Sequence, residues 1–167
     1  TYGEEKVEAL TGLSQITRLR QIALSPSIIF PKYEGRSKLD RLYDIIEERS
    51  GKVVIFSQFA DMISLSADYL EERGISCVTL TGKLSEKKRQ ASLKEFKCGG
   101  ARAILMTYGI GGEGLNLIEA NRAIFLEYAW HPAGMLHASK RILRIGQKSK
   151  QIEFISLHAE GTIEDHV

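Results

Sequence analysis

The sequence predicts an α/β domain built on a parallel sheet with helices on both faces. Short, almost continuously apolar runs recur along the chain, and segments with helical periodicity alternate with them. Strands that are apolar at nearly every position are typical of parallel sheets, because helices cover both of their faces. The 167 residues are enough for one domain with a sizeable core.

Each predicted element has its own signal, and the elements alternate in the order that a parallel sheet requires. The predicted strands are rich in Val, Ile and Phe and cover residues 52–57, 77–82, 101–107, 122–128 and 152–159. The predicted helices between them cover residues 37–51, 61–74 and 85–100, and a further helix begins after Pro132. Ser37 with Asp40, Asp61 and Ser85 are predicted to cap helix starts, and Gly51 and Gly74 to end helices.

A different segment comes before this alternating unit. Residues 7–24 are predicted as a helix, and residues 25–37, which hold two of the three prolines, as an extended connector. We therefore divide the chain into an N-terminal helix and connector, 1–36, and a lobe, 37–167. Because the chain starts without Met and ends on a stretch resembling a helix start, we expect a piece of a longer protein, truncated at its C-terminus.

Charge is informative through its distribution, since the net charge is only +2. Residues 128–152 contain no Asp or Glu but hold five basic side chains: Lys140, Arg141, Arg144, Lys148 and Lys150. Such a stretch indicates an anionic partner, and a solvated basic helix face is the alternative.

Other features exclude several classes of protein. The two cysteines form neither a disulfide framework nor a metal motif, so we expect both to be reduced and no metal ligands. The apolar runs are too short to span a membrane, and no secretory signal is present. We expect an intracellular protein: nuclear if eukaryotic, cytoplasmic or nucleoid-associated if bacterial.

The stretch T-Y-G-I-G-G-E-G-L-N-L (107–117) contains the spacing G-x-G-x-x-G at Gly109, Gly111 and Gly114. Dinucleotide-binding folds share this spacing, but they need a full crossover helix before the next strand, and only about eight residues follow Gly114 here. A glycine-rich turn without a ligand is the second interpretation. The third is phosphate binding, because the turns expose backbone N–H groups where open α/β sheets bind ligands.

The segment 131–147 is predicted to present two arginines together. On a continuous helix Met135, Ala138, Ile142 and Ile145 would form one buried stripe, and His137, Arg141, Arg144 and Lys148 a different stripe. Two adjacent guanidinium groups repel unless an anion lies in front of them, and their planar forks match phosphate oxygens. Such a pair is suited to stabilising charge on a transferring phosphoryl group.

Together, residues 111–117 and 141–147 resemble motifs V and VI of superfamily 2 helicases, and the closer similarity is to the SWI/SNF-type DNA-dependent ATPases. Further similarities follow in the family's order over about 150 residues: R-L-R-Q-I-A-L-S-P-S (18–27), S-K-L (37–39), V-V-I-F-S-Q-F (53–59), L-T-G-K (80–83) and the W-x-P of Trp130. The resemblance implies the C-terminal RecA-like lobe of a two-lobed motor, with an N-terminal helical extension.

The resemblance also implies ligands and partners. ATP and Mg²⁺ would lie between the lobes, held mainly by the first lobe. The partners would be the N-terminal RecA-like lobe of the same chain and double-stranded DNA, with nucleosomes or other DNA-bound proteins, and no membrane. By position, Arg141 and Arg144 would be catalytic arginine fingers; Gly112, Glu113, Gly114 and Gln147 would bind ATP; and Ser57, Gln58, Thr107 and Trp130 would contact DNA.

The chain departs from the family pattern at several positions. His137 stands where the family usually has Gln, Lys140 where it has an acid, and Leu143 where it has His. Ala129 and His131 replace the Asp and Asn that often flank the tryptophan. The arginine pair is intact, and His137 puts a nucleotide contact from its own position in doubt.

The phosphate-binding P-loop and the D-E-x-H box are absent from the sequence. We therefore expect an enzyme only as part of the full-length protein, with the isolated chain inactive. The predicted function is the second motor lobe of an ATP-dependent DNA translocase or chromatin and protein–DNA remodelling protein. The alternatives are an inactive nucleic-acid-binding or protein-interaction module that reuses the lobe, and a nicotinamide-dinucleotide-binding domain.

Overall fold

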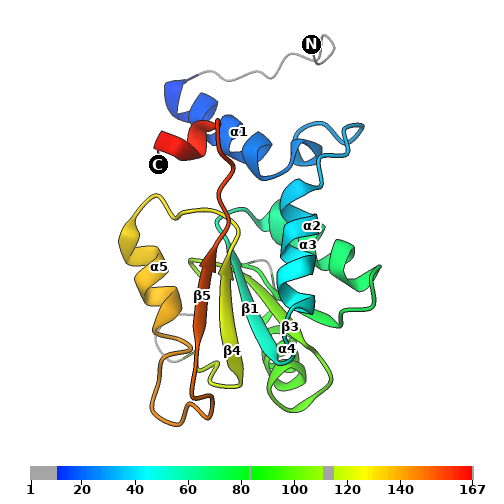
Figure 1. Cartoon of the computed structure of the whole chain (residues 1–167), viewed down its shortest axis with the longest axis vertical. Coiled ribbons are helices and arrows are strands. Elements are labelled where there is room, and N and C mark those ends of the chain that lie inside the picture. The colour runs from blue at the N-terminus through cyan, green and yellow to red at the C-terminus, as the bar shows by residue number, and fades with distance from the viewer. Residues whose placement is uncertain (1–10, 83, 111–114, 167) are drawn as a thin grey trace.

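The computed structural model describes residues 11–82, 84–110 and 115–166. Within these residues five parallel strands form one sheet in the order β2-β3-β1-β4-β5 (Figure 1). The strands are β1 (Lys52–Ser57), β2 (Cys77–Leu80), β3 (Ala103–Thr107), β4 (Ala120–Phe125) and β5 (Glu153–Ser156). The predicted α/β class and parallel sheet are confirmed, and all five predicted strands are present.

Helices cover both faces of this sheet. Two of them, α2 (Ser37–Glu47) and α3 (Ala60–Glu71), pack on the face that carries Ile55 and Leu105. On the opposite face α4 (Glu86–Cys98) and α5 (Pro132–Ser139) lie against Phe56 and Phe125. Because successive strand residues point to opposite faces, the nearly continuous apolar runs supply both cores.

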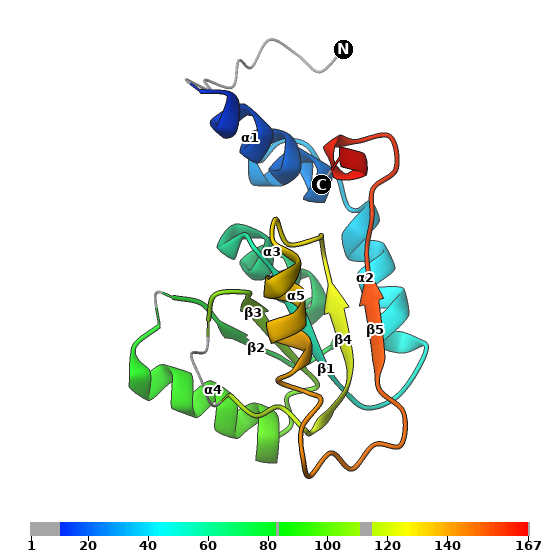
Figure 2. The ribbon, with the colours of Figure 1, turned by 90° about the vertical axis from the view of Figure 1, so that its left-hand side faces the viewer.

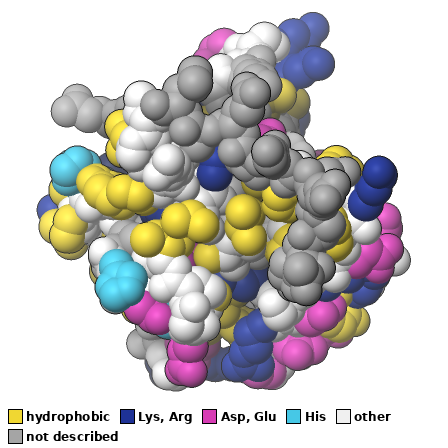
Figure 3. All heavy atoms as spheres, turned by 90° about the horizontal axis from the view of Figure 1, so that it is seen from above, with side chains coloured by type: hydrophobic (Ala, Val, Ile, Leu, Met, Phe, Trp, Pro, Cys, Tyr) yellow, Lys and Arg dark blue, Asp and Glu magenta, His cyan; other side chains and the backbone are white. Residues whose placement is uncertain are grey.

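The remaining elements lie beyond the carboxyl ends of the strands. Helix α1 (Gly12–Leu24) and the C-terminal 3₁₀ turn η2 (Ile163–His166) lie side by side there (Figures 1 and 2). Seen from this end, a row of hydrophobic side chains crosses the surface, and many of the acidic side chains lie toward the rim (Figure 3). Within the described part of the chain, no helix has the length and apolar character needed to cross a membrane.

Several predicted boundaries are wrong for local reasons. Arg36, not Ser37, is the N-cap of α2, and no side chain caps that helix. Helix α3 starts after Phe59, so that Asp61 lies in its first turn and is not the cap. The connector 25–37 is not fully extended either, because Pro26–Ile28 forms a 3₁₀ turn (η1) with proline at a permitted first position.

Candidate nucleotide and nucleic-acid interface

The segment 131–147 is not one continuous helix. Helix α5 ends at Ser139, whose hydroxyl donates to the Met135 carbonyl (2.8 Å), and the following residues form tight turns. The predicted stripe holds for Ala138 and Ile142, which are buried, but Ile145 is fully exposed. A continuous helix would have carried Ile145 back to the core, and the turns carry it to the surface.

The two arginines consequently occupy different environments, contrary to the prediction that they project together. Arg141 is 8% exposed, and its guanidinium donates to the carbonyls of Ile110 and Tyr108 (3.3 Å to the latter). Its own carbonyl accepts from the Leu117 N–H (3.0 Å). Arg141 therefore binds residues on both sides of the glycine-rich segment 111–114.

Arg144, three residues later, is exposed. Burial, and then the charge of Arg144, lower the pKa of the Arg141 guanidinium. The two cations thus repel each other even though only one of them faces solvent. Leu143 and Ile145 beside Arg144 are exposed as well, which gives this surface a mixed apolar and basic character.

The other residues predicted to bind ATP divide into two groups. Gly112, Glu113 and Gly114 lie outside the described residues. The Gln147 amide donates to the carbonyls of Ala120 (3.0 Å) and Ile142 (3.2 Å), and its oxygen accepts from the Ser149 N–H. Gln147 thus joins the arginine segment to the start of β4, and its ATP contact stays a prediction.

Of the residues predicted to contact DNA, Ser57 is placed differently by the structure. It is fully buried at the end of β1, and its hydroxyl donates to Glu127 (3.2 Å), so it offers no surface to DNA. The next residue, Gln58, is exposed and donates its backbone N–H to the same carboxylate. Thr107 ends β3 and is half-buried, and its DNA contact stays a prediction.

Glu127, just after β4, is a buried carboxyl group that the sequence pattern did not single out for this edge. It is 1% exposed, and its second oxygen has no hydrogen-bond partner among the described residues. Burial raises the pKa of Glu127 from 4.5 to about 7, although bonds from Gln58 and Ser57 and the charges of Lys38 and Arg20 lower it. The group therefore titrates near neutrality.

Trp130 is 48% exposed, and a buried arginine lies beneath it. Arg20 of α1 donates to the Gln58 side chain and to the Tyr128 carbonyl, and its guanidinium is 5.6 Å from the Trp130 ring centre. Sequence reasoning missed Arg20 because its partners follow β1 and β4, far along the chain. A buried arginine beside two predicted DNA contacts is visible only in the fold.

Tyr108 connects the Arg141 region to the Glu127 region. Its carbonyl accepts from Arg141, while its hydroxyl donates to the Glu127 carbonyl (2.6 Å). The ring stacks with Phe56 and Phe125. Both regions therefore rest on one side chain that the aromatic core holds in place.

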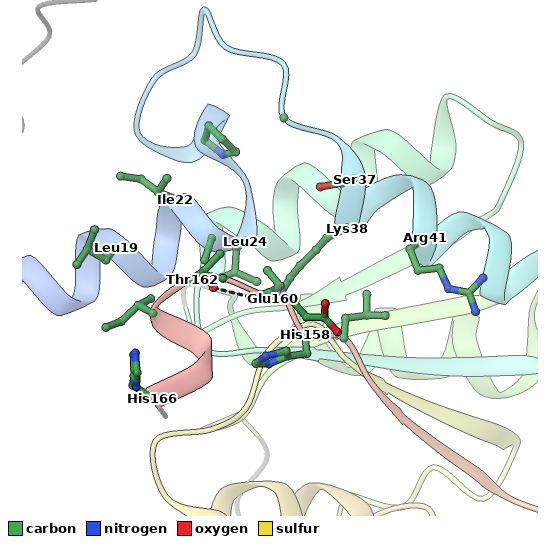
Figure 4. A pocket seen from close by; sticks show the side chains of 17 residues that line it. Leu19, Ile22, Leu24, Ser37, Lys38, Arg41, His158, Glu160, Thr162 and His166 are labelled. Atoms are coloured by element: carbon green, nitrogen blue, oxygen red, sulfur yellow. Dashed lines mark hydrogen bonds between the residues drawn. The ribbon is translucent and has the colours of Figure 1, made fainter. Parts of the chain in front are cut away.

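An open hollow of about 1030 Å³ lies between α1, the start of α2 and the C-terminal segment (Figure 4). Leu19 and Ile22 line it on one side, and His158 and Thr162 on another. Beneath it the buried Lys38 ammonium donates to both oxygens of Glu164 (2.7 and 2.8 Å). None of the predicted site residues lines this hollow, so it is distinct from the interface described above.

The dinucleotide alternative is wrong for this topology. Strand β4, which follows the glycine-rich loop, pairs with β1 and not with β3, and no helix precedes it between Leu115 and Ala120. A dinucleotide fold requires the helix and the neighbouring strand. Across the described ranges, no three His, Cys, Asp or Glu side chains are grouped so that they could hold a metal ion.

Comparisons with known proteins identify the family. The model of the helicase conserved C-terminal domain matches residues 37–146. Human chromodomain-helicase-DNA-binding protein 1 is 33% identical over 131 residues, which cover 77% of this chain and 8% of that protein. The chain spans about a third or less of the length of the curated relatives it matches.

Solved structures give the same answer. The C-terminal domain of the Sulfolobus solfataricus SWI2/SNF2 ATPase superposes with a TM-score of 0.73 at 26% identity, covering 96% of this chain and 69% of that one. The Sulfolobus solfataricus SWI2/SNF2 ATPase core in complex with double-stranded DNA superposes with a TM-score of 0.70 at 29% identity, covering 87% of this chain and 32% of that one. The chain therefore belongs to the helicase conserved C-terminal domain family and is a C-terminal RecA-like lobe of the SWI2/SNF2 type.

Proposed function

We propose that this chain is the second motor lobe of an ATP-dependent translocase on double-stranded DNA or of a chromatin or protein–DNA remodelling ATPase. The observation that carries the proposal is the arrangement of the arginine segment. Arg141 binds Tyr108, Ile110 and Leu117, which flank the glycine-rich segment, and the exposed Arg144 follows Arg141 by three residues. An exposed guanidinium is suited to phosphate oxygens, and a glycine-rich turn can offer backbone N–H groups to the same ligand.

In this proposal the chain contributes to the hydrolysis of an ATP molecule that is bound mainly by another lobe. ATP and Mg²⁺, held mainly by the N-terminal lobe of the full-length protein, supply phosphoryl-transfer chemistry. Arg144 reaches the phosphates and stabilises their negative charge, while Arg141, predicted as a second finger, is buried and instead joins Tyr108 and Ile110 to the turn that carries Arg144. The exposed side chains of Leu136, Leu143 and Ile145 support a protein surface, the first lobe, as the neighbour here.

The DNA-binding part of the proposal rests on Gln58, Thr107 and Trp130 at the carboxyl ends of β1, β3 and β4. An exposed tryptophan can stack on or wedge against nucleic acid. The Sulfolobus solfataricus ATPase core was solved in complex with double-stranded DNA, which supports this ligand class. A DNA-bound motor would act in the nucleus or the nucleoid.

The test is Arg144→Ala in the complete protein, with Arg144→Lys as the second variant. We expect DNA-stimulated ATP hydrolysis to fall by about 10³-fold or more in both, because lysine lacks the planar fork. DNA affinity should be largely kept. Unchanged turnover would rule out the finger role, and a complete protein that binds DNA but never hydrolyses ATP would be the inactive module.

A further inference from the structure

A buried arginine within the family-like stretch 18–27 lies beneath the sheet edge that we propose to contact DNA. Arg20 lies in α1 and is 4% exposed. Its partners come from two distant parts of the chain, Gln58 after β1 and the Tyr128–Trp130 loop after β4. An arginine is rarely buried without such partners, since its charge must be compensated by hydrogen bonds or aromatic faces.

The contacts of Arg20 fix two surface groups at once. Nη1 donates to the Gln58 side-chain oxygen (3.1 Å), and Nη2 donates to the Tyr128 carbonyl (2.6 Å). The guanidinium also lies 5.8 Å from the Phe59 ring centre and 5.6 Å from that of Trp130. Because the guanidinium is a rigid planar fork, one side chain sets the relative position of all these groups.

Gln58 and Trp130 are exposed and receive little orientation from the core. Exposed side chains exchange rotamers freely, and ordering them on a ligand costs conformational entropy. The Gln58 backbone is already fixed from below, because its N–H donates to the buried Glu127. Arg20 supplies the corresponding restraint for the Gln58 side chain and for the Trp130 ring.

We propose that Arg20 is a positioning residue for DNA binding: it holds the Gln58 amide and the Trp130 ring in the orientation that meets the duplex. This inference rests on the proposed function for the identity of the ligand. The restraint on Trp130 does not depend on the ligand, so it can be tested independently of DNA binding.

Trp130 is the one tryptophan in the 167 residues, so its fluorescence reports this restraint directly. We expect Arg20→Met to shift the emission to longer wavelength and to increase quenching by acrylamide. Arg20→Lys keeps the charge but loses the fork, and should give a smaller change in the same direction. Arg18→Met is the matched control: Arg18 is exposed on the same helix, bonds Gln21, and should leave the emission unchanged.

Duplex DNA binding supplies the second readout. For the folded variants, Arg20→Met should weaken binding of a short DNA duplex roughly tenfold, within the range that a stacked aromatic contributes. In a Trp130→Ala background the same substitution should cost much less, because Arg20 acts through that ring. If Arg20→Met does not fold, Gln58→Ala removes the acceptor of Arg20 Nη1 and leaves the buried arginine in place, and it should still alter the Trp130 emission.

Unchanged emission and quenching in the folded Arg20→Met and Arg20→Lys variants would overturn the positioning role. The role would also be overturned if the losses of DNA affinity caused by Arg20→Met and Trp130→Ala were fully additive. Failure of the wild-type chain to bind duplex DNA would overturn the proposed DNA contact and the use of this restraint in DNA binding. In that case the fluorescence series still decides whether Arg20 orders Trp130.

Discussion

Two regions of the sheet's carboxyl edge each contain a buried arginine, and the two arginines hold different things. Arg141 binds backbone carbonyls, so it shapes a loop. Arg20 binds an exposed side chain and the loop before Trp130, so it shapes a surface. Under the proposed function, the Arg141 region would serve the nucleotide and the Arg20 region would serve DNA that lies across exposed side chains.

The difference also extends to the acid that accompanies each region. Glu127 lies among the partners of Arg20, where Gln58 and Ser57 donate to it. Residues 128–152, which contain Arg141, hold no Asp or Glu. The Arg20 region thus holds a buried acid near its arginine, although Arg20 Nε and one Glu127 oxygen have no hydrogen-bond partner among the described residues. The charged Lys and Arg side chains of residues 128–152 have no acid within their own segment.

The largest expected effect tests how fully the neighbours of Glu127 in the Arg20 region compensate the charge of its carboxylate. Because burial raises the pKa of Glu127 to about 7, the folded chain holds this proton more tightly than the unfolded chain. The corresponding stability is present below about pH 4.5 and is lost as the pH rises toward 7, by about 3 kcal/mol in all. Urea unfolding across this range should therefore show Glu127→Gln gaining stability relative to the wild type as the pH rises.

Glu119→Gln is the control for this experiment, because it removes an exposed carboxylate that precedes β4. Its stability difference from the wild type should stay nearly constant between pH 4.5 and 7.5. A constant difference for Glu127→Gln as well would show that the carboxylate is compensated in full and titrates normally.

The sequence was sufficient for the sheet because apolar runs and helical periodicity are local signals. All five strands were located, and the departures concern ends: α5 stops at Ser139 because a local hydrogen bond and tight turns replace the helix there. No propensity argument predicts that stop, since residues 131–147 contain no proline after the first turn. The predicted continuous helix placed Ile145 in the core and Arg141 beside Arg144, whereas the observed turns expose Ile145 and give the two arginines different environments.

The Arg20 region could not be predicted from the sequence, because its members lie 38 and 108 residues apart along the chain. Each is unremarkable in its own segment: an arginine in a helix, a glutamine after a strand, a glutamate at the end of another. The pairing of β1 with β4 brings Gln58 and Glu127 together, and the position of α1 beyond the strand ends adds Arg20. The burial of Ser57 was missed for the same reason, since Glu127 supplies its partner.

The second effect is a difference in the free energy of unfolding between variants of Arg141 and of Arg144. Arg141→Ala leaves the Ile110 and Tyr108 carbonyls without their donor, and we expect a loss of about 2 kcal/mol in the free energy of unfolding. Arg144→Ala removes an exposed side chain and should change it by about 0.5 kcal/mol or less. Equal losses in urea unfolding would contradict the division of roles between a loop-holding and a free arginine.

The smallest effect tests whether the two regions are connected. Tyr108→Phe removes the hydroxyl that donates to the Glu127 carbonyl (2.6 Å) and leaves the stacked ring in place, so we expect a loss of about 1 kcal/mol. If Tyr108 connects the regions, the double variants with Arg141→Ala and with Arg20→Met should both deviate from additivity by about 0.5 kcal/mol or more. Non-additivity with Arg141→Ala alone would confine Tyr108 to the loop that Arg141 holds. Additivity with both would mean that the regions are independent, and that any communication between nucleotide and DNA takes a route other than this tyrosine.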